Sequence, residues 1–124
     1  MDDRLKKALD FSNYMITLDN QKRLLKEKYQ EDLLYYYNGG TFTSTKELIT
    51  FCSSMANNNQ EEIVITDDNN VPIKVVTQEF LDGVIDTYFR ASNKYYVEFD
   101  KLRDEKFDDV FPELAKIWVA YYLL

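Results

Sequence analysis

A stretch without glycine or proline opens the sequence and predicts one long helix, from residue 3 to about residue 37. Its apolar residues are spaced by three or four, as on a single helix face: Phe11, Met15, Leu18, Leu25, Tyr29, Leu33 and Tyr36. Lys22 interrupts this series, and Asn38-Gly39-Gly40 ends it with residues that tolerate positive φ. A helix of about 35 residues would measure roughly 50 Å. It is therefore expected to project from the globule, or to bend near Asn13 or Asp19-Asn20.

Residues 77 to 105 predict a second long helix. Thr77 is its expected N-cap, with Val76 and Leu81 as a hydrophobic staple. A four-three heptad spacing, typical of a helix–helix seam, runs along it with Ser92 as an interruption: Leu81, Ile85, Tyr88, Ser92, Tyr95, Phe99 and Leu102. Two seams of this length predict that the two long helices pack side by side.

Residues 41–76 predict a small α+β unit between the long helices. Thr41-Phe42-Thr43 is β-prone, and a short helix should follow it. Ser44 and Glu47 have the spacing of a capping box at the start of that helix. The run Asn57-Asn58-Asn59 should end it, because Asn side chains compete with helical hydrogen bonds. Its inner face is expected to carry Leu48, Ile49, Cys52 and Met55.

Residues 62–76 predict a β-hairpin, because two β-branched runs flank the turn residues Asp67-Asp68-Asn69-Asn70. A three-residue loop with Asn69 left-handed would place four apolar side chains on one face, pairing Ile65 with Val71 and Ile63 with Ile73. Pro72 cannot donate a ladder hydrogen bond, so its strand should lie at an edge. Residues 41–43 could add a third strand.

A last helix is expected to begin near Pro112, a residue that suits the first helical position. Together these elements predict an α+β fold, mostly α, in a single domain of residues 1–124. It consists of two long packed helices, a short helix, a small antiparallel β-hairpin and a C-terminal helix over residues 112–124. The hairpin and the short helix should cap one end of the long pair.

The residue inventory excludes most familiar enzyme chemistry. The sequence has no His and a single Cys, which removes Ser-His-Asp and Cys-His sites and the usual zinc sites. Asp67-Asp68-Asn69-Asn70 lacks the alternating ligands of a calcium loop. Cys52 is expected to be a buried small hydrophobe rather than a reactive thiol. We therefore expect no enzyme, no catalytic residue, no metal and no cofactor; chemistry carried by carboxylates and tyrosines alone is the third hypothesis.

The net charge is −7, from 15 Lys and Arg against 22 Asp and Glu. Such a chain repels phosphate backbones, and acidic residues interleave with its one basic stretch, residues 22–28. Direct nucleic-acid binding is therefore not expected. Neither a signal peptide nor a stretch of the roughly 20 apolar residues of a membrane span is present. We expect a soluble cytoplasmic protein without membrane contact.

The apolar residues 117–124 allow two interpretations. They could form a helix docked on the long pair. Alternatively, they could anchor a protein partner, or drive self-association into a homo-oligomer, because exposed apolar patches mark interaction sites. In that case the partner-binding residues would be Trp118, Tyr121, Tyr122 and Leu124.

The run Leu33–Thr43, followed by a helix and an acidic-turn hairpin, resembles small uncharacterised proteins of large contractile-tailed bacteriophages, particularly those of marine cyanobacteria. The resemblance covers residues 5 to about 103 and implies a phage protein acting in the host cytoplasm. Our first hypothesis is a non-enzymatic interaction protein: an assembly factor, a virion accessory or a host-targeting adaptor with a phage or host protein partner. The alternative is an accessory protein of a phage transcription, replication or recombination complex.

Overall fold

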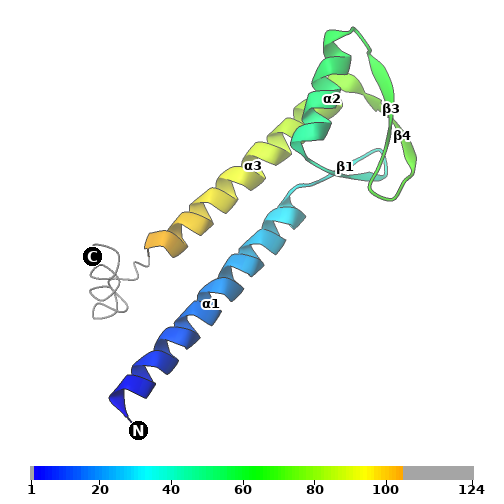
Figure 1. Cartoon of the computed structure of the whole chain (residues 1–124). Coiled ribbons are helices and arrows are strands. Elements are labelled where there is room, and N and C mark those ends of the chain that lie inside the picture. The colour runs from blue at the N-terminus through cyan, green and yellow to red at the C-terminus, as the bar shows by residue number, and fades with distance from the viewer. Residues whose placement is uncertain (1, 105–124) are drawn as a thin grey trace. The chain divides into compact units, whose positions relative to one another are not determined.

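The computed structural model describes residues 2–104 of the chain. Along these residues the elements follow in this order (Figure 1): α1 (Asp3–Asp32), β1 (Leu34–Tyr37), β2 (Gly40–Thr43), α2 (Lys46–Asn57), β3 (Glu62–Thr66), β4 (Pro72–Val76) and α3 (Thr77–Asp104). The predicted class, α+β and mostly α, is confirmed. The chain divides into two compact units: the helical unit, here residues 2–25 and 96–104, and the mixed unit, residues 26–95. The C-terminal helix predicted for residues 112–124 lies outside the described residues.

The first helix ends at Asp32, and the prediction that it continues to residue 37 is wrong. The aromatic run Leu34–Tyr37 forms β1, which pairs antiparallel with β2. Asn38 and Gly39 join the two strands with φ angles of 48° and 78°. Positive φ at both central residues defines the two-residue turn that fits the twist of a hairpin. The Asn-Gly pair therefore begins a hairpin instead of ending a helix, and Tyr36 lies exposed on a strand.

The second helix is present as predicted, but its cap lies one residue later. Thr45 is the N-cap, and its hydroxyl accepts a hydrogen bond of 3.1 Å from the Leu48 backbone N–H. The predicted capping box of Ser44 and Glu47 is therefore wrong. Ser44 is fully buried, and its backbone N–H donates to the carbonyl of Leu33, the residue that follows α1 (2.8 Å). The predicted inner face is confirmed for three of its four residues: Cys52 is buried, and Leu48 and Ile49 pack on the core. In place of the fourth, Met55, Ala56 packs on the core.

The hairpin of β3 and β4 has a register two residues away from the predicted one. Val75 lies opposite Ile63, and Ile73 lies opposite Ile65. A shift of two residues leaves each side chain on its face, so Ile63, Ile65 and Ile73 pack against the core as predicted. Val75 takes the place of Val71, which is 48% exposed. Pro72 is at an edge as predicted, because the sheet has only two strands. The β2 strand pairs with β1 and does not join this sheet.

The carboxylate of Asp67 explains the longer loop. Its Oδ1 accepts hydrogen bonds from the backbone N–H groups of Asn69 and Val71, both at 2.9 Å. Its Oδ2 accepts from the backbone N–H of Thr41 in β2 at 3.2 Å. Asn70, instead of the predicted Asn69, is the left-handed residue (φ 61°). One side chain therefore closes the loop and ties it to the neighbouring hairpin.

We expect Asp67→Asn to lower the melting temperature by several degrees at neutral pH. An amide can replace only one acceptor oxygen, so an N–H group would face the Thr41 amide. The hydrogen bonds, first that from Val71, hold the pKa of Asp67 below its usual range. The stabilisation is therefore present above the ordinary Asp pKa of about 4 and is lost as the pH falls through the lower pKa of the folded state.

Thermal unfolding of the wild type and of Asp67→Asn across acidic pH checks this prediction. The difference in melting temperature should shrink as the pH falls. Asp82→Asn is the control, because that carboxylate lies exposed on α3 and accepts from the Gln78 side chain only one turn away (2.9 Å). A difference between wild type and Asp67→Asn that stays constant down to the lowest pH would contradict the assignment.

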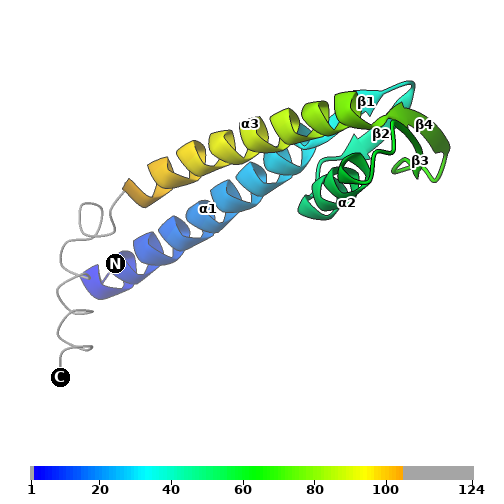
Figure 2. The same cartoon turned by 90° about the horizontal axis from the view of Figure 1, so that it is seen from above.

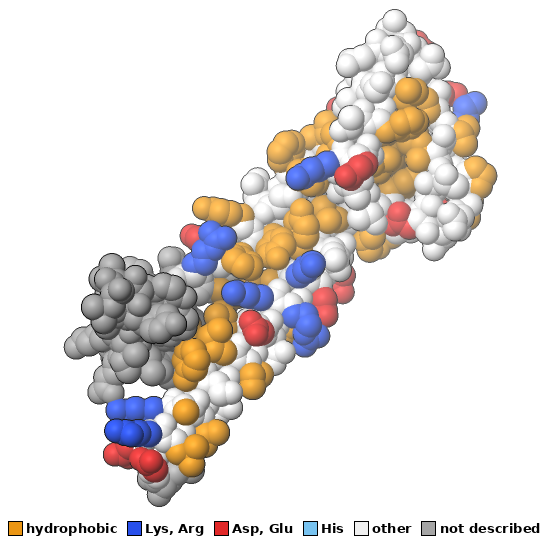
Figure 3. Space-filling model, in the orientation of Figure 1, with side chains coloured by type: hydrophobic (Ala, Val, Ile, Leu, Met, Phe, Trp, Pro, Cys, Tyr) orange, Lys and Arg blue, Asp and Glu red, His pale blue; other side chains and the backbone are white. Residues whose placement is uncertain are grey.

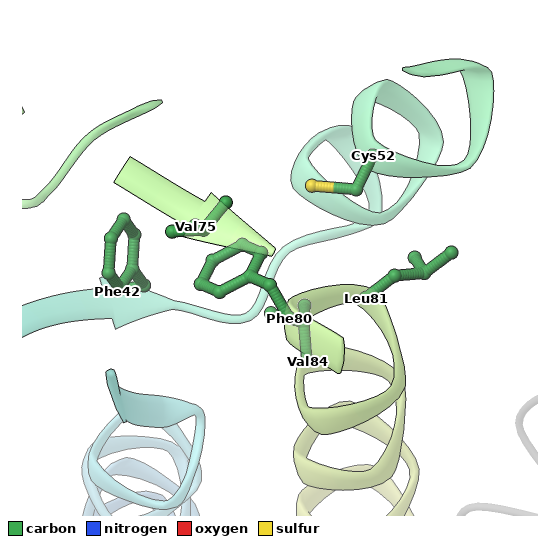
Figure 4. Packing of buried hydrophobic residues seen from close by; sticks show 6 residues of the cluster. All are labelled: Phe42, Cys52, Val75, Phe80, Leu81 and Val84. Carbon is green, nitrogen blue, oxygen red and sulfur yellow. The ribbon is translucent and has the colours of Figure 1, made fainter. Parts of the chain in front are cut away.

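The core of the mixed unit forms where β2, β4 and α2 meet the start of α3 (Figure 4). Phe80 on α3 is fully buried at its centre. Its ring centroid lies 4.8 Å from that of Phe42, 5.4 Å from Tyr37 and 5.7 Å from Tyr35. Aromatic pairs at these distances prefer tilted or edge-on geometries, as here. The buried cluster consists of Phe42, Cys52, Val75, Phe80, Leu81 and Val84.

The second long helix begins at Thr77, as predicted, and ends at Asp104 among the described residues. The capping role predicted for Thr77 is not observed. Its side chain is buried, and its hydroxyl has no hydrogen-bond partner among residues 2–104. Its backbone N–H donates instead to the Glu61 carbonyl (2.9 Å), which links the start of α3 to the entry of β3.

Candidate interaction surface

The predicted seam side of α1 lies against α3 in both units. In the mixed unit, the Tyr29 hydroxyl is 3.0 Å from the Ser92 hydroxyl, and the Tyr29 ring centroid is 4.6 Å from that of Tyr95. In the helical unit, the Lys22 ammonium lies 5.8 Å from the centroid of the Phe99 ring. The side-by-side packing of the two helices is therefore confirmed.

These contacts explain why each seam is interrupted once. Ser92 is small and carries a hydroxyl, so it gives room and a hydrogen-bond partner to Tyr29. Lys22 lies over an aromatic face, where a cation is attracted to the ring quadrupole. Arg103 lies over the same Phe99 ring at 5.0 Å. Each polar residue in one seam is thus matched by an aromatic residue in the other.

A second apolar series lies on the other side of α1. It consists of three apolar residues and one serine, spaced by four, three and four residues, and we call it the outer stripe: Leu5, Leu9, Ser12 and Ile16. Leu9 and Leu18 are nine positions apart, which at about 100° per residue places them on opposite sides of the helix. Leu5 is 53% exposed, Leu9 46% and Ile16 57%. Apolar side chains therefore occupy two opposite faces of this helix.

The outer stripe is confined to the first half of α1. The positions that would continue its spacing are Asp19 and Arg23, both charged and exposed. No residue of α1 is buried. Figure 3 shows hydrophobic side chains at the surface near the N-terminal end of the chain, among charged ones. A helix with this pattern is not explained by packing on a single neighbour.

The described residues offer little for catalysis. No group of three or more potential metal ligands occurs among them. Cys52 is fully buried, and burial raises the pKa of its thiol to about 11, so the reactive thiolate is suppressed. The expected role of Cys52 as a buried hydrophobe is thus consistent with its surroundings.

Two hollows in the mixed unit also offer little for catalysis. One of about 310 Å³ is lined by Asp32, Thr87, Arg90 and Lys94 among others. Its cations already pair with carboxylates, Lys94 with Asp32 at 3.6 Å and Arg90 with Asp86. The other, of about 380 Å³, lies between the end of α2 and the start of α3 and is lined mainly by amide and apolar side chains. Neither brings a nucleophile next to a base.

The site residues predicted from the sequence, Trp118, Tyr121, Tyr122 and Leu124, lie outside the described residues, so their partner-binding role stays a prediction. The outer stripe was not predicted. Its four-three-four spacing is visible in the sequence, but it overlaps with the seam series of the same helix.

Comparisons of the chain with protein-family models, with curated proteins and with solved structures find no match. Across residues 2–104, none of the helices has the length and apolar character needed to cross a membrane.

Proposed function

We propose that the chain is a non-enzymatic protein–protein interaction protein and that the outer stripe of α1 is a contact surface for its partner. The observation that carries this proposal is the exposure of Leu5, Leu9 and Ile16 at helical spacing on a helix without a buried residue. Helices that dock into a groove present anchors at this spacing. Exposed apolar patches of this kind mark interaction sites.

The size of the stripe limits the kind of binding. Full burial of a Leu or Ile side chain contributes about 1.5–3 kcal/mol, so covering three half-exposed ones contributes roughly 2–4 kcal/mol. Association itself costs about 4–15 kcal/mol in lost freedom. The stripe alone therefore does not hold a partner. The partner has to form a groove that also covers the polar flanks of the helix, for example around Lys6 and Asn13.

The biological setting of the proposal rests on the sequence resemblance of Leu33–Thr43 to proteins of contractile-tailed phages. In that setting the chain acts in the host cytoplasm as an assembly factor, a virion accessory or a host-targeting adaptor. Its partner is a phage or host protein.

Capture of partners from the native cell tests the proposal. With Leu9→Glu we expect recovery of the specific partner to fall about tenfold or more, since 1.4 kcal/mol corresponds to a factor of ten. Val64→Glu is the matched control, because Val64 is an apolar residue of β3 that is 64% exposed. It should leave recovery unchanged. Equal recovery with Leu9→Glu and with Val64→Glu, with helicity retained in both, would remove the stripe from the binding surface.

A further inference from the structure

The two edges of the β3–β4 hairpin differ in how far they are covered. Figures 1 and 2 show this hairpin beside the hairpin of β1 and β2. At the β4 edge the Lys74 carbonyl accepts a hydrogen bond of 3.0 Å from the Asn38 side chain. The backbone N–H of Val76 donates to the Tyr37 hydroxyl at 3.4 Å. Pro72 has no N–H to donate, so the β4 edge offers little to a further strand.

The β3 edge is open. Hydrogen-bonded and non-hydrogen-bonded pairs alternate along an antiparallel ladder. The pair of Asp67 with Val71 is hydrogen-bonded (2.8 Å), and so is that of Glu61 with Thr77 (2.9 Å). The even-numbered residues of β3 therefore turn their backbone N–H and C=O groups away from β4. Across the described part of the chain, these backbone groups have no hydrogen-bond partner in three residues: Glu62, Val64 and Thr66.

The side chains of β3 do not protect this edge either. Edge strands are commonly protected by a lysine, a proline, an inward-pointing charge or a bulge. The β3 strand contains neither Lys nor Pro, and its pairing with β4 has no bulge. Its one charged residue, Glu62, pairs with Lys74 of the same hairpin (3.0 Å). Val64 at its centre is 64% exposed, and Ile63 and Ile65 on the other face are only half-buried.

We propose that β3 pairs antiparallel with β3 of a second copy of this chain, about a two-fold axis at Val64, to form a four-stranded sheet. In this register Val64 lies opposite Val64 of the second copy, and Glu62 lies opposite Thr66 of the second copy. All three residues with open backbone groups are then paired, and each such pair exchanges two hydrogen bonds.

The side chains favour a second copy as the occupant of this edge. On the outer face Glu62 meets an uncharged Thr66, so no like charges lie directly opposite within the paired strands. On the inner face Ile63 lies opposite Ile65 of the second copy, which covers side chains that are half-buried in one chain. Both β4 edges then lie at the outside of the sheet, where Pro72 opposes a further strand. Association therefore closes at two copies.

The inference goes beyond the proposed function and does not depend on it. The outer stripe of α1 takes no part in the pairing of β3, so a single chain and a dimer present the same stripe to a partner. The contact of two five-residue strands is small, so we expect a weak dimer that dissociates on dilution.

Amide exchange of the full-length wild type, resolved by residue in dilute and concentrated samples, tests the pairing. In the single chain the amides of Glu62, Val64 and Thr66 lack a partner, whereas those of Ile63 and Ile65 belong to the ladder with β4. We expect protection of the first three amides to rise several-fold with concentration, and that of the other two to change little.

Sedimentation equilibrium of Val64→Pro measures the contribution of the edge. The dissociation constant of the dimer should rise about tenfold or more, because both hydrogen bonds exchanged by the two Val64 residues lose their donors. Lys74→Pro is the matched control. Lys74 lies directly opposite Val64, its N–H points out of the β4 edge, and its ion pair with Glu62 is exposed and contributes little. This variant should dimerise as the wild type does.

Three results would overturn the inference. The first is a wild type that stays monomeric up to about 1 mM, which would leave the edge to a strand of another protein. The second is a dimer in which the amides of Glu62, Val64 and Thr66 gain no protection, because the contact would then lie elsewhere. Neither result depends on whether a variant folds. The third is an equal effect of Val64→Pro and Lys74→Pro on dimerisation, with both variants folded.

Discussion

Replacing Phe80 by Ala is expected to lower the free energy of unfolding by about 3–5 kcal/mol, the range measured for large aromatic residues in cores. Phe80 is fully buried, and three aromatic rings surround it. These rings come from both strands of the first hairpin, and Val75 of the second hairpin joins the same cluster. The loss is a large part of the 5–15 kcal/mol that typically stabilises a domain.

Chemical denaturation of Phe80→Ala and of Phe89→Ala measures this effect. Phe89 is the matched control, because it lies on the same helix but is 57% exposed. We expect Phe89→Ala to cost much less, since little of its ring is removed from water. Comparable losses for the two variants would show that Phe80 is not the centre of the core.

Replacing Gly83 by Ala is expected to destabilise the protein by about 1–3 kcal/mol, the usual cost of overpacking. This is the reverse of the ordinary effect, because Ala stabilises a helix interior over Gly by roughly 0.5–1 kcal/mol. A Cβ at Gly83 would overlap with the hydroxyl and the ring of Tyr35. Glycine at this position of α3 thus allows the ring from β1 to lie against the helix.

The sign of the Gly83→Ala effect should change when the ring is removed. In a Tyr35→Ala background, Gly83→Ala should become stabilising, and a double-mutant cycle by chemical denaturation measures the coupling. Stabilisation by Gly83→Ala with Tyr35 still present would contradict the close approach of β1 and α3.

The long helices and the hairpins differ in how far local sequence determines them. The seams of α1 and α3 follow from apolar spacing alone, because each helix repeats one pattern over many turns. The position at which α1 ends does not follow from apolar spacing. Leu34–Tyr37 fits both a helix face and a strand, and the positive φ angles of Asn38 and Gly39 decide for the strand. The register of β3 and β4 depends on Asp67, whose carboxylate also binds Thr41, far away in the sequence.

The outer stripe could not be predicted from the sequence, for a different reason. The outer stripe and the seam share residues 5–18 of one helix, so their apolar positions interleave in the sequence. Taken together, the two series give the helix no single apolar face, so their spacing does not indicate which face packs on a neighbouring helix. In the helical unit the contact of Lys22 with Phe99 identifies the side of α1 that α3 covers, and hence the side that is left.

Hydrogen exchange of the chain, alone and with its captured partner, tests the proposed contact surface most directly. Exchange of the amides of residues 3–18 in the free chain, where no side chain of α1 is buried, gives the reference. With the partner bound, we predict protection across residues 3–18 and unchanged exchange in β3 and β4. Protection confined to the mixed unit, with residues 3–18 unaffected, would contradict the assignment of the outer stripe as the binding surface.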